Sequence, residues 1–303
     1  MEKITLPAFI INFDIRLHYS KKQIFDLSGD TLLTVKSDSN SFKLNPKVIC
    51  ADPFLFVSAN QLFLFYEEQT GYYANGVIKM ISTSDLINWT SPKTVLEESF
   101  HLSFPFIFED KGINYMIPES CEDRSIRIYE FTSDDLTSCK LNHKILDTYA
   151  YVDSSIIKEN SVYYLFTTRI EKNNYSQLLF YSDSLNGNFE EHPKSPICIQ
   201  KKYARNAGSV FKKDSKLYRP SQDCSRTYGE KVSIHEITIL NQNDYQESTI
   251  NDNILSSHMN IYPFGGHHFN SVTFQGKEII ATDIRRPYFN IFRIYYWIKS
   301  KLK

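Results

Sequence analysis

One pattern recurs five times along the chain: a short apolar strand, a polar turn, and a second apolar strand that ends on a polar or charged residue. In the first copy, Asp52 near the start of one strand stands fifteen residues before Glu67 at the end of the next. The same spacing separates the matching positions of the other copies: Phe104 and Glu119, Ser154 and Arg169, Gly208 and Asp223, and His268 and Asp283. A strand pair repeated in this way predicts an all-β protein built from five similar units.

The distance between successive copies narrows the fold further. They start roughly 50 to 60 residues apart, and β-strand repeats of about 40–50 residues are typical of propeller blades. We therefore predict a five-bladed β-propeller over residues 1–285. Two strand-like pieces near the N-terminus, at 9–17 and 31–35, should pair with the last blade, because such pairing removes free sheet edges.

Residues 286–303 form a second predicted unit, a basic and aromatic C-terminal helix or tail. From residue 285 onward the chain carries six bases and no acid, and apolar residues surround most of the expected helix. Aromatic and cationic side chains suit the headgroup region of an anionic membrane. Docking against the side of the propeller is the alternative, and the sequence leaves both open.

The distribution of charge argues against nucleic acid as a partner. The formal net charge is −1, and residues 1–284 carry 28 bases against 35 acids, whereas binding to phosphate backbones needs a basic face. The five cysteines are scattered without a CxxC pair, which fits neither a disulfide framework nor a zinc site. We find no signal-peptide core and no membrane-spanning apolar run. We therefore expect a cytoplasmic protein, peripheral at the inner membrane if the tail binds lipid.

Three carboxylates occupy inner positions of the repeat. Asp52 opens the first blade, Glu119 ends the second strand of the second blade, and Asp153 opens the third. Because equivalent positions of propeller blades face one axis, these acids should converge. Glycosyl chemistry uses two carboxylates, one as acid and one as base or nucleophile, and crowding raises the pKa of at least one. We predict all three as catalytic residues; the alternative is that Asp52 and Asp153 only cap strand starts.

The fourth and fifth copies add cations and amides. Arginine binds phosphates or carboxylates through paired hydrogen bonds, so we expect this part of the pocket to hold an anionic group of a substrate. Adjacent histidines in a strand point to opposite faces, so one of the two in this region should enter the pocket. The residues predicted here to bind substrate are Arg169, Arg205, Arg219, Gln222, Asp223, His267 and His268. No metal site and no cofactor is predicted.

The repeat and the stretch Ala51-Asp52-Pro53 resemble the five-bladed propeller glycosidases, the relatives of arabinanases, xylosidases and invertases. In that group an Asp at the start of blade one is base or nucleophile, a second Asp opening a later blade supports it, and a Glu is the acid. The resemblance implies the first two roles for Asp52 and Asp153. The acid would open blade four, but residues 204–209 contain no carboxylate. Either Glu119 acts as the acid from another blade, or this is not an ordinary hydrolase.

Residues 45–285 resemble more closely the N-terminal domain of plant glucosamine inositolphosphorylceramide transferases and its stand-alone bacterial relatives, many of them linked to surface-glycan synthesis. In the plant proteins a separate domain looks like the transferase. The second of the matching stretches adds His101 to the residues expected to bind substrate. The matching stretches are 51–56, 100–105, 115–120, 204–208, 219–224 with 228–229, and 266–268.

Three functions are consistent with these features. We expect a carbohydrate-active enzyme, a glycosyltransferase of bacterial surface polysaccharide (capsule or O-antigen) biosynthesis. It would use a phosphate-containing sugar donor and a glycan or lipid-linked acceptor. The first alternative is an intracellular glycoside hydrolase of the furanosidase type, which would release sugar without a nucleotide or lipid donor. The second is a non-catalytic glycan-binding propeller, in which changing the three acids would leave function intact.

Overall fold

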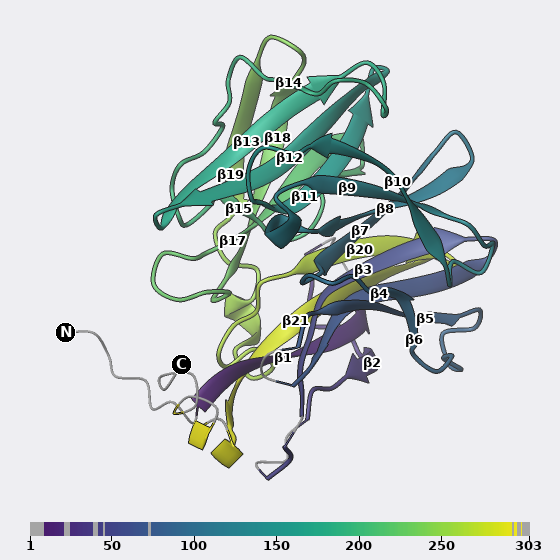
Figure 1. Cartoon of the computed structure of the whole chain (residues 1–303), viewed down its shortest axis with the longest axis vertical. Helices are drawn as coiled ribbons and strands as arrows, with labels where there is room; N and C mark the ends of the chain where they lie inside the picture. Colours follow the sequence, from purple (N-terminus) through teal and green to yellow (C-terminus); the bar gives the residue numbers. More distant parts are fainter. Residues whose placement is uncertain are drawn as a thin grey trace.

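The computed structural model describes residues 9–20, 25–38, 42–44, 46–71, 74–292, 294, 295 and 298. Nearly all regular structure in them is β-strand, arranged as five antiparallel blades (Figure 1). The predicted fold class, a five-bladed β-propeller, is confirmed.

Four blades follow one another along the chain, each listed from its inner to its outer strand. Blade one contains β3 (Lys47–Ser58), β4 (Gln61–Thr70), β5 (Val77–Thr83) and β6 (Lys93–Leu96). Blade two contains β7 (Ser103–Asp110), β8 (Ile113–Glu119), β9 (Ile126–Phe131) and β10 (Cys139–Leu146). Blade three contains β11 (Tyr151–Glu159), β12 (Val162–Glu171), β13 (Asn174–Ser182) and β14 (Glu190–Glu191). Blade four contains β15 (Arg205–Asn206) and β16 (Phe211–Lys213), then β17 (Lys216–Gln222), β18 (Val232–Leu240) and β19 (Tyr245–Asn251).

The fifth blade joins both ends of the chain, as the N-terminal strand pattern predicts. It contains β20 (Phe269–Phe274) and β21 (Lys277–Phe289) with β1 (Phe9–Tyr19) and β2 (Thr31–Val35). β1 lies antiparallel to β21 along its full length, so the ring is closed by main-chain hydrogen bonds (Figure 1). A single parallel bridge, Phe13 with Ile49, continues this blade into blade one. Two short 3-10 turns, η1 (Cys121–Asp123) and η2 (Ser256–His258), lie in connections.

The hydrophobic core lies between blades. On β4 the run from Leu62 to Tyr66 is buried on both faces, because an inner strand is covered by both neighbouring blades. Alternation sends Phe63 and Phe65 into the cluster shared with blade two, whereas Leu64 faces the cluster shared with blade five. Each such side chain contributes about 1.5–3 kcal/mol through burial. This accounts for the many short aromatic runs of the sequence.

The innermost strands of blades one to three share a kink that aims side chains at the axis. Each has a bulge in its pairing with the next strand, between Ala51 and Phe54 in blade one and at matching places in the other two. The bulged residue has a positive φ: 52° at Asp52, 45° at Phe104 and 53° at Asp153. A bulge bends the strand and redirects a side chain. The structural equivalent in blade three is therefore Asp153, one residue before the Ser154 of the sequence repeat.

Polar contacts connect neighbouring blades around the axis. The Phe104 amide donates to Asp52 Oδ2 at 3.2 Å, which joins blades one and two. Blades three and four are joined by Asn206 Nδ2, which donates to the Asp153 carbonyl at 2.7 Å. The Phe269 amide donates to the Ala207 carbonyl at 2.7 Å and joins blades five and four. The Leu55 amide donates to Asn270 Oδ1 at 2.9 Å and joins blades one and five.

The last strand of the propeller extends into the predicted C-terminal segment. β21 continues past the expected boundary at residue 285 to Phe289, because β1 offers it a pairing partner as far as Phe9. Beyond it, positions 291, 292, 294, 295 and 298 have helical backbone, and the remaining residues of the predicted tail lie outside the described part of the chain. Among the described residues, no helix has the length and apolar character needed to cross a bilayer.

Candidate functional site

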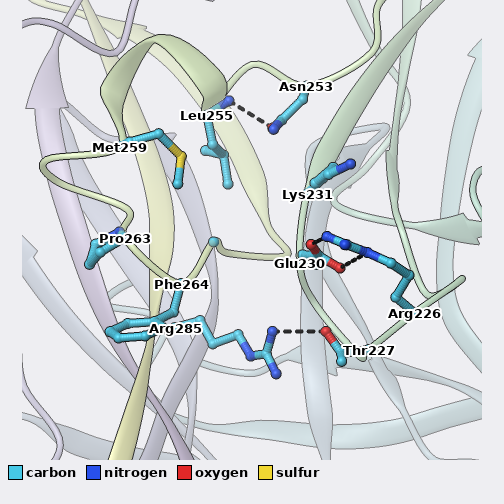
Figure 2. A pocket seen from close by; sticks show the side chains of 11 residues that line it. Arg226, Thr227, Glu230, Lys231, Asn253, Leu255, Met259, Pro263, Phe264 and Arg285 are labelled. Carbon is cyan, nitrogen blue, oxygen red and sulfur yellow. Dashed lines mark hydrogen bonds and ion pairs between the residues drawn. The ribbon is translucent and has the colours of Figure 1, made fainter.

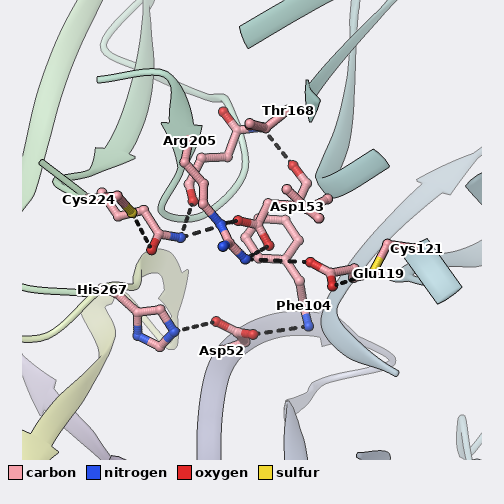
Figure 3. Close-up of polar contacts among 12 residues, drawn as sticks. Asp52, Phe104, Glu119, Cys121, Asp153, Thr168, Arg205, Cys224 and His267 are labelled. Atoms are coloured by element: carbon pink, nitrogen blue, oxygen red, sulfur yellow. Dashed lines mark hydrogen bonds and ion pairs between the residues drawn. The ribbon is translucent and has the colours of Figure 1, made fainter. Parts of the chain in front are cut away.

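A group of buried carboxylates occupies the axial ends of the inner strands. Asp52 is on β3, Glu119 ends β8 and Asp153 is on β11, and each is at most 8 % exposed. Figure 3 shows the three side chains around the guanidinium of Arg205. The structure thus brings together the three acids that the repeat predicts at one axis. Their catalytic role stays a prediction.

Arg205 links the acids of blades two and three. From β15 it donates through Nε to Asp153 Oδ2 at 2.5 Å, and its Nη2 lies 3.6 Å from Glu119 Oε2 (Figure 3). Gln222, on the neighbouring β17, donates to the same Asp153 oxygen at 3.2 Å. Burial would lower the pKa of Arg205, but Asp153 and Glu119 raise it well above its usual value. The sequence predicts Arg205 as a ligand for a substrate anion, whereas the structure commits its guanidinium to two carboxylates of the protein.

Both histidines of the Gly-Gly-His-His sequence reach Asp52. His267 Nε2 and His268 Nδ1 lie 3.4 and 3.5 Å from Asp52 Oδ1. The expectation that one histidine enters the pocket is therefore wrong. It assumed strand alternation, but β20 begins at Phe269, and the two residues belong to the preceding loop.

A second acid, Asp283, contacts the other ring nitrogen of His267. Asp283 Oδ2 lies 2.5 Å from His267 Nδ1, and Asp283 Oδ1 accepts the amide protons of both histidines. Burial lowers the pKa of His267, but Asp283 and Asp52 outweigh it and raise the pKa above its usual value. Asp52 has the opposite balance: burial raises its pKa, yet His268, His267 and Arg205 together hold it at about 2. Asp52 is therefore a buried but ionised carboxylate.

Glu119 is buried beside other acids and behaves differently. Burial first, and then the charge of Asp153, raises the pKa of Glu119 to about 8, against a smaller opposing effect of Arg205. The thiol of Cys121, in the turn η1, lies 3.2 Å from Glu119 Oε1. At neutral pH Glu119 is therefore mostly protonated and can donate a proton.

Sequence reasoning missed Glu67, a fourth buried acid of the inner strands. It ends the apolar run of β4, is 5 % exposed, and its Oε1 lies 3.4 Å from His101 Nε2. The Gly76 amide donates to His101 Nδ1 at 2.9 Å, so the neutral ring carries its proton on Nε2, facing Glu67. Burial, followed by the charges of Asp52 and Glu119, raises the pKa of Glu67 well above its usual value.

The signal for the missed acids was present in the repeat. Glu67 and Asp283 are each the second member of a pair spaced by fifteen residues, as is Glu119. Tyr228 was also missed as a site residue. Its ring lies over Arg205, with the guanidinium carbon 5.0 Å from the ring centre, and meets the ring of His267 edge-on at 5.0 Å. Tyr228 is 40 % exposed, and its ring covers one side of the Arg205 guanidinium.

Three predicted residues lie outside this group. Arg219 is fully buried, but it pairs with Glu247 through Nε and Nη2. Arg219 and Gln222 are three positions apart on β17, so alternation places them on opposite faces of the blade. Asp223 accepts hydrogen bonds from Ser225 and closes the turn after β17. Arg169 is partly exposed on β12, near Glu171 and over the ring of Tyr149.

Three of the central side chains could together hold a cation. Asp52, His267 and Asp283 offer ligand atoms that all lie within 4.8 Å of one another, although the sequence predicts no metal site. The contacts of His267 with both carboxylates are those of an imidazolium shared between two acids. His267 and the two acids therefore form a buried ion-paired group.

The arrangement suits glycosyl chemistry. Its surroundings keep Asp52 ionised and Glu119 protonated. Two carboxyl groups with different pKa values can act as acid and base in one site, as glycosyl chemistry requires. The group also contains more acids than cations, so its centre favours an uncharged or cationic part of a ligand.

A family model described as "Glucosamine inositolphosphorylceramide transferase 1, N-terminal" matches residues 27–283. Similar curated proteins are the glucosamine inositolphosphorylceramide transferases 1 of rice (Oryza sativa subsp. japonica) and Arabidopsis thaliana. The first is 36 % identical over 214 residues, 68 % of this chain and 28 % of the relative. The second is 33 % identical over 246 residues, 78 % of this chain and 32 % of the relative. The chain thus spans less than a third of the length of these relatives.

Solved structures share the fold at low sequence identity. An α-L-arabinofuranosidase from Podospora anserina, in complex with cellotriose, aligns with a TM-score of 0.55 and 9 % identity, over 77 % of this chain and 90 % of that one. A family 117 glycoside hydrolase from Zobellia galactanivorans aligns with a TM-score of 0.53 and 11 % identity, over 82 % and 89 %. These likenesses support the propeller. The match over residues 27–283 shows that this chain belongs to the family of the N-terminal domain of glucosamine inositolphosphorylceramide transferase 1.

Proposed function

We propose that this chain is a carbohydrate-active enzyme that transfers a sugar to a glycan or lipid-linked acceptor during assembly of a bacterial surface polysaccharide. Its relatives are named as transferases of a sugar to a phosphate-containing lipid, which supports a sugar donor and a glycolipid acceptor. The surface-polysaccharide setting comes from the bacterial proteins that the sequence resembles.

The observation that carries the proposal is the placement of two buried acids at one axis in opposite surroundings, Asp52 between two histidines and Glu119 beside another acid. Asp52, with its pKa near 2, stays ionised in the presence of two histidines. Glu119, with its pKa near 8, keeps its proton at neutral pH because it is buried beside Asp153. A purely structural pair would not need this difference, whereas general acid–base catalysis does.

In the proposed step the bond between the anomeric carbon of the donor and its leaving oxygen breaks, and Glu119 gives its proton to that oxygen. A new bond forms between the anomeric carbon and the acceptor hydroxyl oxygen, and the hydroxyl proton passes to Asp52. In such a direct transfer Asp52 is the base. If Asp52 instead attacks the anomeric carbon first, the acceptor oxygen then displaces the Asp52 carboxylate, and the hydroxyl proton passes to Glu119, which gave up its own proton in the first step. Asp153 contributes by holding Arg205 beside Glu119.

We place the donor phosphate away from the two arginines that the sequence predicts as its ligands. Arg205 and Arg219 were both expected to bind it, yet each is paired with carboxylates of the protein. Buried charges that already have partners gain little from a second anion. The acid-rich centre therefore receives the sugar, and any phosphate of the substrate lies outside it.

A glycoside hydrolase is the second candidate, because the same two acids would serve if water replaced the acceptor. The two differ in whether an acceptor is required. Purified chain would be incubated with lipid-linked, nucleotide-linked and aryl sugars, with and without glycan acceptors, and products would be identified by mass spectrometry. A product joined to the acceptor supports transfer, and free sugar alone supports hydrolysis.

Two substitutions test the assigned roles. Asp52→Asn and Glu119→Gln should each lower the rate by several orders of magnitude, because an amide cannot act as base, nucleophile or acid. Glu171→Gln, at an exposed carboxylate of blade three, is the matched control and should leave the rate unchanged. The wild-type rate should fall above pH 8, where Glu119 loses its proton. Unchanged rates in both variants would show that neither acid takes part in the reaction, whereas glycan binding with no product from any donor would identify a propeller without catalysis.

A further inference from the structure

A pocket of about 620 Å³ opens beside the acid group, between blades four and five (Figure 2). Its walls come from the loop between β17 and β18, from the segment around η2 that leads to β20, and from Arg285 of β21. Pockets of a few hundred Å³ are typical of small-molecule sites. Neither the sequence patterns nor the proposed chemistry uses it.

One side of this pocket is cationic. Arg226, Lys231 and Arg285 line it, together with a single carboxylate, Glu230. Arg226 and Glu230 pair with each other through two contacts (Figure 2), so their charges largely cancel. The Arg285 guanidinium forms a hydrogen bond with a hydroxyl: its Nη1 donates to Thr227 Oγ1 at 3.0 Å. Lys231 Nζ lies 3.9 Å from Oδ2 of the Asp223 carboxylate.

The other side is apolar and partly open to solvent. Met259 and Phe264 are 53 % and 52 % exposed, and Pro263 and the buried Leu255 continue the same wall. Figure 2 shows Met259, Pro263 and Phe264 on the side opposite Lys231 and Glu230. Large exposed apolar side chains that line a cavity together mark a surface that binds an apolar group.

The pocket adjoins the candidate catalytic group through three segments. Thr227 precedes Tyr228, Gly265 lies two residues before His267, and Arg285 lies two residues after Asp283. The Arg285 amide donates to the Gly265 carbonyl at 2.9 Å, which ties two of these segments together. The walls of the pocket therefore lead within one or two residues to Tyr228, His267 and Asp283.

From the charge, the apolar wall and this position, we propose that the pocket binds a phosphate ester that carries an apolar chain. Lys231, Arg285 and the Thr227 hydroxyl would hold the phosphate, and Phe264 and Met259 would contact the chain. This is the anion site that the acid-rich centre cannot provide. That the bound phosphate ester is the substrate rests on the proposed function; the binding itself does not.

Binding is tested by calorimetry of the whole chain with three probes: octyl phosphate below its micelle concentration, inorganic phosphate, and octyl glucoside. Octyl phosphate should bind at least tenfold more tightly than either of the others, and its affinity should fall with salt. Arg285→Gln and Phe264→Ser should each weaken it about tenfold. Lys140→Gln, at an exposed cation of blade two, should have no effect. Equal affinity for inorganic phosphate and octyl phosphate, or full affinity in Arg285→Gln, would overturn the proposal.

Binding of octyl phosphate and transfer of sugar, measured on the same variants, distinguish failure of this inference from failure of the catalytic proposal. Asp52→Asn should bind octyl phosphate as the wild type does, because Asp52 does not line the pocket. If octyl phosphate binds but no sugar is transferred, the catalytic proposal fails and the binding site stands. If sugar is transferred but octyl phosphate does not bind, the inference fails alone.

Discussion

The guanidinium of Arg205 and the carboxylate of Asp153 form a buried ion pair across the boundary between blades three and four. Nε to Oδ2 is 2.5 Å, and the exposed fractions of the two side chains are 13 % and 3 %. The pair joins a residue at the bulge of one inner strand to a residue of the next blade, and Glu119 of blade two lies within 3.6 Å of the same guanidinium. One cation thus holds three blades together at the axis.

Replacing Arg205 should destabilise the whole propeller. Arg205→Gln would leave the Asp153 carboxylate buried without its cation, and removing one partner of a buried ion pair typically costs about 3–5 kcal/mol. Urea unfolding followed by circular dichroism measures this difference. Arg205→Lys keeps the charge and should lose less than half as much. A Gln variant as stable as the wild type would show that the pair contributes nothing to folding.

The stability of the protein should fall as pH rises from about 5 to 9. Glu119 has a folded pKa near 8, above its ordinary value of 4.5, so the folded state binds more protons than the unfolded state between these values. The raised pKa of His267 acts in the same direction: its contribution is complete below pH 6.5 and is lost above its folded pKa. Urea unfolding at several pH values tests this. Glu119→Gln should flatten the slope between pH 5 and 8; an equal slope would contradict the assignment of Glu119.

Tyr228 should control the pKa of Glu119 by keeping water away from Arg205 and its acids. Tyr228→Ala removes the ring that lies over Arg205, at a cost of about 0.5–2 kcal/mol for the cation–π contact. With water admitted, the pKa of Glu119 should fall from about 8 towards its ordinary value. NMR of glutamate carboxyl carbons follows this titration. Tyr228→Phe keeps the ring and should keep the high value, and an unchanged pKa in the Ala variant would disprove this shielding role.

Arg219 should matter for folding and not for substrate. Its pair with Glu247 is fully buried on the arginine side and holds the pKa of Glu247 near 2, against the effect of burial. Arg219→Met should cost about 3–5 kcal/mol in urea unfolding, and Arg219→Met combined with Glu247→Leu should recover most of it. If instead Arg219→Met stays stable but loses substrate binding, the original sequence-based assignment is right.

The repeat predicted the architecture and the convergence of the acids because both depend on periodicity. Fifteen-residue strand pairs specify a blade, and equivalent positions of blades must face one axis. The same reasoning could not distinguish the roles of Arg219 and Gln222. Their spacing places them on opposite faces of one strand, but the sequence alone does not show where β17 begins and ends. It also treated His267 and His268 as strand residues, although the loop before β20 presents both to Asp52. Ion-pair partners such as Glu247 come from other strands, and no local sequence pattern identifies them.

At Gly208 the backbones of blades four and five lie in contact, and the position cannot carry a side chain. Its φ is +134°, and a Cβ there would lie 2.0 Å from the carbonyl oxygen of Phe269. That carbonyl belongs to the residue whose amide bonds to Ala207 at 2.7 Å, so a shift would break a contact between blades. Gly208→Ala should therefore cost more than about 3 kcal/mol in urea unfolding, or prevent folding. Gly276→Ala is the matched control, with φ +71° and no atom within 4 Å of its Cβ; it should cost only about 1–2 kcal/mol, the strain of the left-handed backbone. Similar losses in both variants would mean that backbone conformation, and not the contact with Phe269, selects glycine at position 208.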